Sequence, residues 1–194
     1  MLLDFGGVVI RTPFEMLHRV GHPEWAGPFD PDSDPLWRAM QIGEMTERDY
    51  WDRRATEVFP GVDDPVASLM DTLFAPPRDD VIRPETMMLI EEVPRPAVLT
   101  NDLARFHSPA WLDEMGLGTS FDPLIDLSYT GRLKPHPLAY AHAVERLDAD
   151  PGQVVFADDQ PANVAAGIAF GLHAVWFDVT DPRGSVERIR LALG

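Results

Sequence analysis

Short apolar stretches recur along this sequence, each followed by polar residues and separated from the next by a helical pattern. We interpret five of them as buried strands: residues 1–10, ending in a tight turn around Gly6 and Gly7, and residues 97–100, 124–127, 154–157 and 174–177. Patterns typical of helices lie at residues 85–93, 105–115, 137–147, 161–170 and 185–193. Strands that are apolar on both sides need helices on both faces. The alternation therefore predicts an α/β fold with a doubly wound parallel sheet.

One region, from about residue 12 to residue 83, breaks this alternation. It contains no convincing strand but four helical patterns, at residues 14–20, 36–42, 46–59 and 65–74. Thr46 has the residue type and the place of a helix N-cap. The sequence therefore predicts two domains: an α/β core of residues 1–12 and 82–194, and a small helical domain of residues 13–81 inserted after the first strand.

The balance of charges argues against several classes of partner. The 194 residues include 16 Lys+Arg and 32 Asp+Glu, which gives a formal net charge of −16. Such a chain repels nucleic acid and anionic membranes, so we expect neither as a partner. The sequence contains no cysteine, and its apolar runs are too short to span a bilayer. Asp4 interrupts the apolar opening, which does not fit a signal peptide, and we expect a cytoplasmic monomer or homodimer.

Several polar residues follow the predicted strands or the turns beyond them. They are Asp4, Thr100, Asn101, Lys134, Asp158 and Asp159. Because the carboxyl ends of parallel strands meet at one edge of a sheet, we expect these side chains to converge on one crevice. Three carboxylates with an ammonium, a hydroxyl and an amide suit a hard cation together with an anionic oxygen ligand.

Four short motifs carry a family resemblance. In order, they are Asp4-Phe-Gly-Gly-Val, Thr100-Asn101, Lys134-Pro135 and Asp158-Asp159-Gln-Pro-Ala-Asn163. Each motif alone is a weak signal, and the acidic pair before Pro161 also fits plain helix capping. In this order and on these elements, they resemble the haloacid dehalogenase superfamily, in the subclass with a helical (C1-type) cap inserted after the first strand. The resemblance extends from Asp4 to about Phe177 and implies a Rossmann-like core.

The resemblance implies a magnesium-dependent hydrolase with Asp4 as its catalytic nucleophile. Asp4 would form an aspartyl-phosphate with a small phosphorylated metabolite, which is the expected partner. Mg²⁺, the expected cofactor, would be held by Asp4, the backbone carbonyl of Gly6, Asp158 and Asp159.

The remaining motif residues would bind the phosphoryl group. The residues that the resemblance places against it are Gly7, Thr100, Asn101 and Lys134. Lys134 would also act in catalysis, by neutralising charge on the phosphoryl group and on Asp4. Asn163, about one helical turn beyond Asp159, would orient that ligand or Lys134.

Position 6 departs from the family pattern. Phosphatases of this family usually carry an aspartate two residues after the nucleophile, where it protonates the leaving group and then activates water, but here that residue is Gly6. A general acid–base group contributes roughly 10²–10⁴-fold to the rate, so its loss slows turnover without necessarily abolishing it. His18 and His22 are candidates for a substitute, although surface histidines are the more common interpretation. Two alternatives stay open: a weakened binding or regulatory member of the family, and a haloacid dehalogenase, which is disfavoured because those enzymes carry an aromatic residue at this position.

Overall fold

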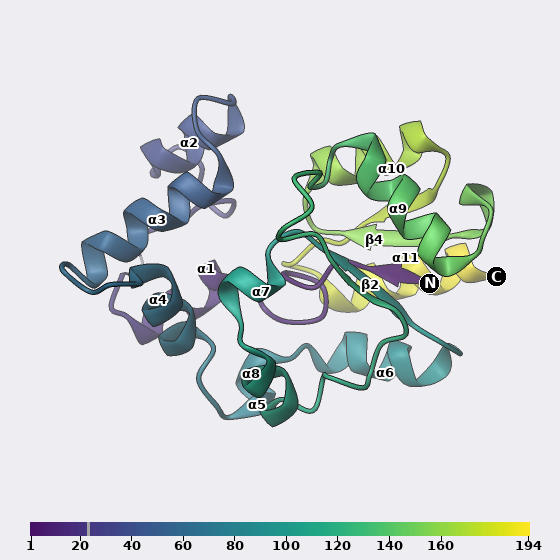
Figure 1. Ribbon diagram of the computed structural model, residues 1–194, viewed down its shortest axis with the longest axis horizontal. Helices are drawn as coiled ribbons and strands as arrows, with labels where there is room; N and C mark the ends of the chain where they lie inside the picture. Colours follow the sequence, from purple (N-terminus) through teal and green to yellow (C-terminus); the bar gives the residue numbers. More distant parts are fainter. Residues whose placement is uncertain (23) are drawn as a thin grey trace. The chain divides into compact units, whose positions relative to one another are not determined.

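The computed structural model describes residues 1–22 and 24–194, which form two compact units (Figure 1). The first unit comprises residues 1–11 and 76–194. Its strands are β1 (Leu2–Leu3), β2 (Ala97–Thr100), β3 (Leu124–Asp126), β4 (Val155–Asp158) and β5 (His173–Trp176). Its helices are α5 (Arg78–Val81), α6 (Pro84–Glu92), α7 (Leu103–Phe106), α8 (Pro109–Glu114), α9 (Pro137–Leu147), α10 (Pro161–Phe170) and α11 (Pro182–Leu193), with a 3₁₀ turn at Pro151–Gln153. Among the described residues, no helix has the length and apolar character needed to cross a membrane.

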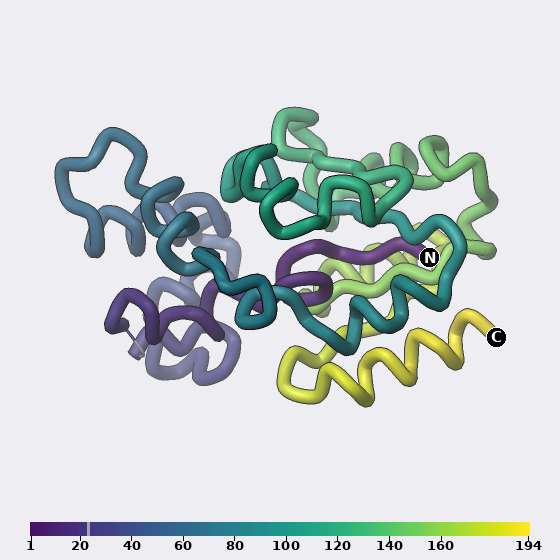
Figure 2. The backbone as a smooth tube through the Cα atoms, turned by 90° about the horizontal axis from the view of Figure 1, so that it is seen from below, coloured from purple at the N-terminus to yellow at the C-terminus, as the bar shows by residue number. Residues whose placement is uncertain are grey.

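The five strands form one parallel sheet in the order β3-β2-β1-β4-β5, which confirms the predicted doubly wound α/β fold. β1 is central, because Leu2 pairs with Ala97 of β2 and with Phe156 of β4. Helices α9 and α10 pack against each other on one face of the sheet, and α6 and α11 pack together on the other (Figures 1 and 2). The strand order changes direction between β1 and β4, and ligands of such sheets bind beyond the carboxyl ends of the strands at this point.

The three inner strands, β1, β2 and β4, are buried as their sequences predict. The prediction was wrong for the edge strand β5, whose side chains are half-buried or exposed, and β3 at the other edge is buried only in part. Leu99 and Phe156 belong to a core cluster together with Ala139, Tyr140 and Ala143 of α9. These three helix positions lie on one face of α9, because residues three and four apart are neighbours on a helix. Their burial fixes α9 against the sheet, and with it the end of the loop that precedes α9.

The first strand is shorter than predicted. The sequence suggested a strand within residues 1–10, but β1 covers only Leu2–Leu3, and the predicted turn around Gly6 and Gly7 follows it. The amide of Ile10 donates to the carbonyl of Phe5 at 3.0 Å, so the chain folds back on itself. The apolar residues after the turn are buried without extending the strand, which explains the error.

The helix predicted over residues 105–115 is divided in two. α7 ends at Phe106, and Ser108 is the N-cap of α8, where its hydroxyl accepts from the amide of Trp111 at 3.1 Å. Pro109 lacks an amide hydrogen and disfavours a helical conformation at the residue before it. The helical spacing of apolar residues continues across this break, so the pattern alone did not reveal it.

The second unit, residues 12–75, is helical. It contains α1 (Pro13–Met16), a 3₁₀ turn (Leu17–Arg19), α2 (Pro35–Gln41), α3 (Glu47–Val58) and α4 (Pro65–Leu73). Thr46 is the N-cap of α3, as predicted, and forms a reciprocal capping box with Asp49. Four aromatic rings with centroids 4.9 to 5.8 Å apart pack together in this unit: Phe14, Trp37, Tyr50 and Trp51.

The segment that leads back to the α/β unit joins that unit earlier than the sequence suggested. The predicted helical domain ran to residue 81, whereas residues 76–81 belong to the α/β unit. There, the guanidinium of Arg78 donates to the carbonyl of Met115 at 2.7 Å, and Val81 accepts from the amide of Arg11 at 2.8 Å. These hydrogen bonds tie the segment to the α/β core.

Candidate active site

Three carboxylates gather at the carboxyl edge of the sheet. Asp4 directly follows β1, Asp158 ends β4, and Asp159 begins the connection to α10. Each contributes an oxygen, and these oxygens lie within 4.8 Å of one another. The sheet register explains the first contact: Leu3 pairs with Ala157, so Asp4 and Asp158 follow at neighbouring strand ends. The structure thus brings together the three acidic side chains that the sequence singled out.

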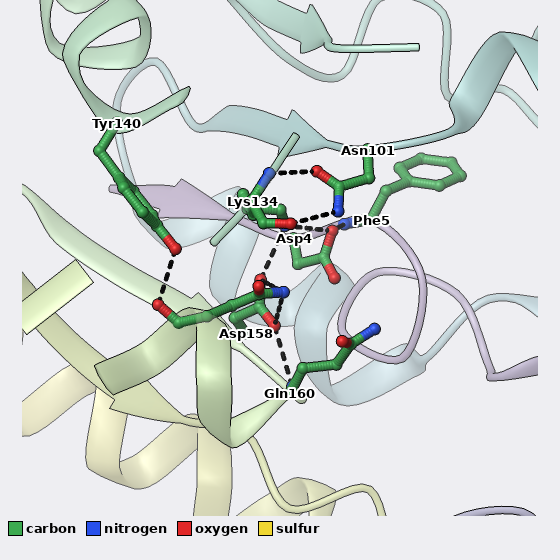
Figure 3. A network of polar contacts seen from close by, with 8 residues as sticks. Asp4, Phe5, Asn101, Lys134, Tyr140, Asp158 and Gln160 are labelled. Atoms are coloured by element: carbon green, nitrogen blue, oxygen red, sulfur yellow. Dashed lines mark hydrogen bonds and ion pairs between the residues drawn. The ribbon is translucent and has the colours of Figure 1, made fainter. Parts of the chain in front are cut away.

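Lys134 lies between two of these carboxylates (Figure 3). Its Nζ is 2.8 Å from Asp4 Oδ1 and 2.7 Å from Asp158 Oδ2, and its side chain is 1% exposed. Burial alone lowers the pKa of this ammonium, but the two carboxylates outweigh burial and hold the pKa of Lys134 above its ordinary value. Lys134 therefore places a fixed positive charge in a site that is otherwise acidic.

Asn101 fixes the backbone of Lys134. Its Oδ1 accepts from the Lys134 amide at 2.8 Å, and its Nδ2 donates to the Lys134 carbonyl at 3.0 Å (Figure 3). Both ends of the side-chain amide thus bind the main chain of one residue, a role that the sequence did not indicate. Thr100 is buried, and its carbonyl accepts from the amide of Leu127 at 2.9 Å. The end of β2 therefore anchors the loop that carries Lys134 at two points.

Asp158 is completely buried and is held from several sides. Besides the ion pair with Lys134, its carboxylate accepts from Nδ2 of Asn163 at 3.0 and 3.2 Å and from the amide of Gln160 at 2.9 Å. The sequence analysis expected Asn163 to orient Asp159 or Lys134. The structure shows its side-chain amide on Asp158 instead, because Asp158 is the member of the acidic pair that points inward from β4.

Two further contributors to the site were not among the site residues predicted from the sequence. Tyr140, on the buried face of α9, donates from its hydroxyl to the carbonyl of Asn163 at 2.8 Å (Figure 3). Trp176 ends β5, and its indole Nε1 donates to the carbonyl of Asp159 at 2.9 Å. The sheet register brings this indole close, since Asp158 and Trp176 are paired across β4 and β5. In the sequence, Trp176 resembles an ordinary packing residue, whereas Tyr140 ends the stretch from Lys134 that resembles the third motif of the family.

Gly6 and Gly7, the two adjacent glycines of the turn after β1, differ in whether a residue with a Cβ atom would fit in their place. A Cβ atom at Gly7 would lie 2.4 Å from Oδ2 of Asp159, and Gly7 has a φ of +77°. Only glycine allows the turn to approach this carboxylate so closely. A Cβ atom at Gly6 would meet no heavy atom within 4 Å, and the φ of Gly6 lies outside the left-handed region. The backbone thus requires glycine at position 7 but not at position 6.

The electrostatics of Asp4 favour a bound cation. The pKa of Asp4 is raised from 3.8 to about 7, because the increase due to burial and to Asp158 exceeds the decrease due to Lys134. A carboxylate whose ionised form is destabilised in this way is stabilised by further positive charge nearby. Lys134 supplies one positive charge among three carboxylates, so the donor set fits a divalent cation that prefers oxygen ligands.

The two histidines considered as substitute acid–base groups lie in the helical unit. His18 is exposed. His22 Nδ1 is 2.8 Å from the carboxylate of Glu24, and its ring stacks on Trp25 with centroids 4.3 Å apart. These contacts are local to the surface of the helical unit.

Comparisons of sequence place the chain in a family. A model of the haloacid dehalogenase-like hydrolases matches residues 15–171. Acyl-CoA dehydrogenase family member 10 of Mus musculus is 28% identical over 99 residues, which cover 50% of this chain and 9% of that protein. Ribulose-1,5-bisphosphate 5-phosphatase of Halopiger xanaduensis is 26% identical over 148 residues, which cover 73% of this chain and 62% of that protein. The match thus spans less than two thirds of the length of either relative.

Solved structures share the fold at low sequence identity. A phosphatase of this superfamily from Thermococcus onnurineus has a TM-score of 0.57 at 20% identity, covering 91% of this chain and 85% of that chain. L-2-haloacid dehalogenase from Xanthobacter autotrophicus has a TM-score of 0.53 at 18% identity, covering 90% and 75%. A mutant enzyme of the superfamily from Bacteroides thetaiotaomicron, in complex with magnesium and inorganic phosphate, has a TM-score of 0.55 at 13% identity, covering 92% and 93%. With the family model matching most of its length, this chain belongs to the haloacid dehalogenase-like hydrolases.

Proposed function

We propose that this chain is a magnesium-dependent phosphatase, which acts on a small phosphorylated metabolite through an aspartyl-phosphate on Asp4. The observation that carries the proposal is the position of Lys134 Nζ, 2.8 Å from Asp4 and 2.7 Å from Asp158. A phosphate monoester is an anion, and a nucleophilic carboxylate repels it unless positive charge lies close to both groups. The similarity to a bisphosphate phosphatase supports the same class of substrate.

Magnesium is the metal that we propose for the three carboxylates. Asp4 and Asp159 would bind it together with the backbone carbonyl of Gly6. Asp158, whose carboxylate already binds Lys134, would contribute directly or through water. Bound there, the ion would neutralise charge on the phosphoryl oxygens. The magnesium and phosphate bound to the Bacteroides thetaiotaomicron enzyme, which has the same fold, support this choice.

In the proposed reaction, Asp4 attacks the phosphorus atom, and the bond from phosphorus to the leaving oxygen breaks. Water then attacks the phosphorus of the aspartyl-phosphate, which releases phosphate and regenerates Asp4. Lys134 stays protonated throughout, because its pKa is held above its ordinary value, and it acts through its charge. The hydroxyl of Thr100, the side-chain amide of Asn101 and the backbone amide of Gly7 would donate to the phosphoryl oxygens.

We also propose that the helical unit, residues 12–75, is a cap that selects the substrate. It is inserted between β1 and β2 in the sequence, which is the position expected of such a cap. Its aromatic cluster and the buried ion pair of Arg54 with Asp34, at 2.7 Å, give it a core of its own. A unit with its own core can move as one body.

Gly6 favours a second candidate function, a family member that binds magnesium and phosphate-like ligands with little turnover. Glycine has no side chain with which to protonate the leaving group. A carbon–halogen hydrolase, in which Asp4 would attack carbon without a metal, has less support. The similarity to a dehalogenase structure, at 18% identity, concerns the fold alone, and the gathering of three carboxylates suits a cation.

Hydrolysis of p-nitrophenyl phosphate, with Mg²⁺ or with EDTA, tests these functions. We expect magnesium-dependent turnover that disappears in Asp4→Asn and persists in Asp178→Asn, a matched change of an aspartate that follows β5. A native protein that binds Mg²⁺ in calorimetry but does not hydrolyse this activated ester would favour the second candidate. Halide release from 2-chloropropionate that continues in EDTA would favour the dehalogenase.

A further inference from the structure

We propose that a pocket beside the outermost strand of the sheet binds a small oxyanion, at a site separate from Asp4. The pocket has a volume of about 220 Å³ and is lined by Leu127, Thr130, Arg132, Leu138 and His142. These residues come from the loop that follows β3 and from the first turns of α9. All of them differ from the residues of the three-carboxylate site, so the pocket offers a second location for a ligand.

The strand order separates this pocket from Asp4. β3 is an edge strand, and Asp4 follows β1, which lies two strands further into the sheet. Neighbouring strands are about 4.8 Å apart, so the end of β3 and the end of β1 are separated by roughly 10 Å. A ligand in the pocket would therefore be a neighbour of the proposed substrate and would not replace it.

The loop wall of the pocket is ordered by its own hydrogen bonds. The amide and the hydroxyl of Thr130 donate to the carbonyl of Leu127, at 2.9 and 3.0 Å. The amide of Arg132 donates to the hydroxyl of Thr130 at 3.1 Å. The amide of Leu127 is in turn bound to the carbonyl of Thr100 in β2, at 2.9 Å. A pocket whose wall is already ordered loses little entropy when a ligand binds.

The chemistry of the lining selects an anion with a short apolar part. Arg132 carries a permanent positive charge, and His142 presents a ring N–H in either protonation state. Within residues 1–22 and 24–194, neither side chain forms an ion pair with a carboxylate. Leu127 and Leu138 supply apolar surface. A carboxylate or phosphate group attached to a short hydrocarbon part matches both features.

The volume of the pocket matches a small metabolite or the anionic end of one. A volume of about 220 Å³ corresponds to roughly seven water molecules at about 30 Å³ each. The chain has a net charge of −16, so most of its surface repels anions. The guanidinium of Arg132, which has no carboxylate partner among the described residues, attracts them.

The test is a titration of the ¹⁵N-labelled chain with inorganic phosphate and, separately, with butyrate, followed by amide chemical shifts. EDTA is present, so magnesium does not contribute to binding. We expect saturable shifts at Thr130, Arg132 and His142. Arg132→Gln should weaken binding roughly tenfold, because it removes a charged hydrogen-bond donor. Arg146→Gln, a matched change of an exposed arginine near the other end of α9, should leave the affinity unchanged.

Two results would overturn the proposal. One is a titration in which neither anion gives saturable shifts at these three amides, even if shifts appear in the turn around Gly6 and Gly7. The other is the same affinity in Arg132→Gln as in the native chain. Saturation with phosphate alone, with butyrate alone or with both identifies the anionic group that the pocket takes. The measurement needs no turnover, so failure of the proposed phosphatase activity would leave this test intact.

Discussion

Placing a carboxylate at position 6 should accelerate the phosphatase reaction that we propose for this chain. The turn has room for the change, because a Cβ atom at Gly6 would meet no heavy atom within 4 Å and the backbone there is not left-handed. In the proposed reaction, the leaving oxygen departs without a proton donor at this position. Gly6→Asp would supply a carboxyl group two residues after Asp4, on the same turn.

The expected gain follows from the chemistry of proton transfer and from the charges already present. General acid–base catalysis contributes roughly 10²–10⁴-fold, which is about 2.7–5.5 kcal/mol of transition-state free energy. Three carboxylates already lie within 4.8 Å of one another, and repulsion from them favours the protonated form of a further carboxyl group. That is the form that donates a proton. We expect kcat/KM to increase about 10²-fold, near the lower limit of this range, because no neighbouring group is arranged to orient the new side chain.

The assay compares two esters that differ in their leaving groups, p-nitrophenyl phosphate and glycerol phosphate. The gain in kcat/KM should be larger for the alkyl ester, whose leaving alkoxide needs the proton more than nitrophenolate does. Gly6→Asn is the matched control, since it has a similar size and no acidic proton. An equal gain in Gly6→Asn would refute the reasoning. So would a folded, magnesium-binding Gly6→Asp protein that is no faster on the alkyl ester.

Three further changes test the groups that support the site and the fold. Gly7→Ala should weaken Mg²⁺ binding in calorimetry about tenfold or more, because its Cβ would lie 2.4 Å from Asp159 Oδ2; Gly152→Ala, at an open position, should not. Trp176→Phe removes the indole donor to the Asp159 carbonyl and should weaken Mg²⁺ binding about fivefold, or about 1 kcal/mol. An unchanged affinity would show that this hydrogen bond does not position the carboxylate. Burial lowers the pKa of His107 from 6.5 to about 3, so the unfolded chain takes up a proton first as the pH falls, and the folded state loses stability between these two values. From pH 7 to pH 5 this loss amounts to about 2 kcal/mol, and His107→Phe should lack it when urea unfolding is compared at the two pH values.

The elements that carry the site were predictable where both of their ends have local chemical signals. The helix at residues 137–147 was predicted with its observed bounds, and Pro137 suits its first turn. In the structure, Asp148 ends this helix in the left-handed conformation. The helix at residues 161–170 is similar, with a proline in its first turn and Gly171 after its end. Such signals act within a few residues and are visible in a single sequence.

The contacts that complete the site depend on registers and loop paths that no local signal encodes. Trp176 reaches the carbonyl of Asp159 because β5 pairs with β4 in one particular register. Asn101 binds the main chain of Lys134 across 33 positions of sequence, and only the path of the loop after β3 brings them together. The sequence indicated that Asn101 belongs to the site, but not that its side chain positions Lys134.

Of the two glycines in the turn after β1, only one is required by the geometry of the backbone. Gly7 is required by geometry, because the carboxylate of Asp159 occupies the place of its missing Cβ. Gly6 has open space around it, so its lack of a side chain is a chemical feature of the site and not a steric necessity. If the native chain turns over as proposed, the leaving group of its substrate must depart without a proton from position 6. Acyl phosphates, enol phosphates and phosphoanhydrides meet this condition better than alkyl esters do, because their leaving oxygens are stable as anions. The comparison of leaving groups therefore bears on the natural substrate as well as on the engineered carboxylate.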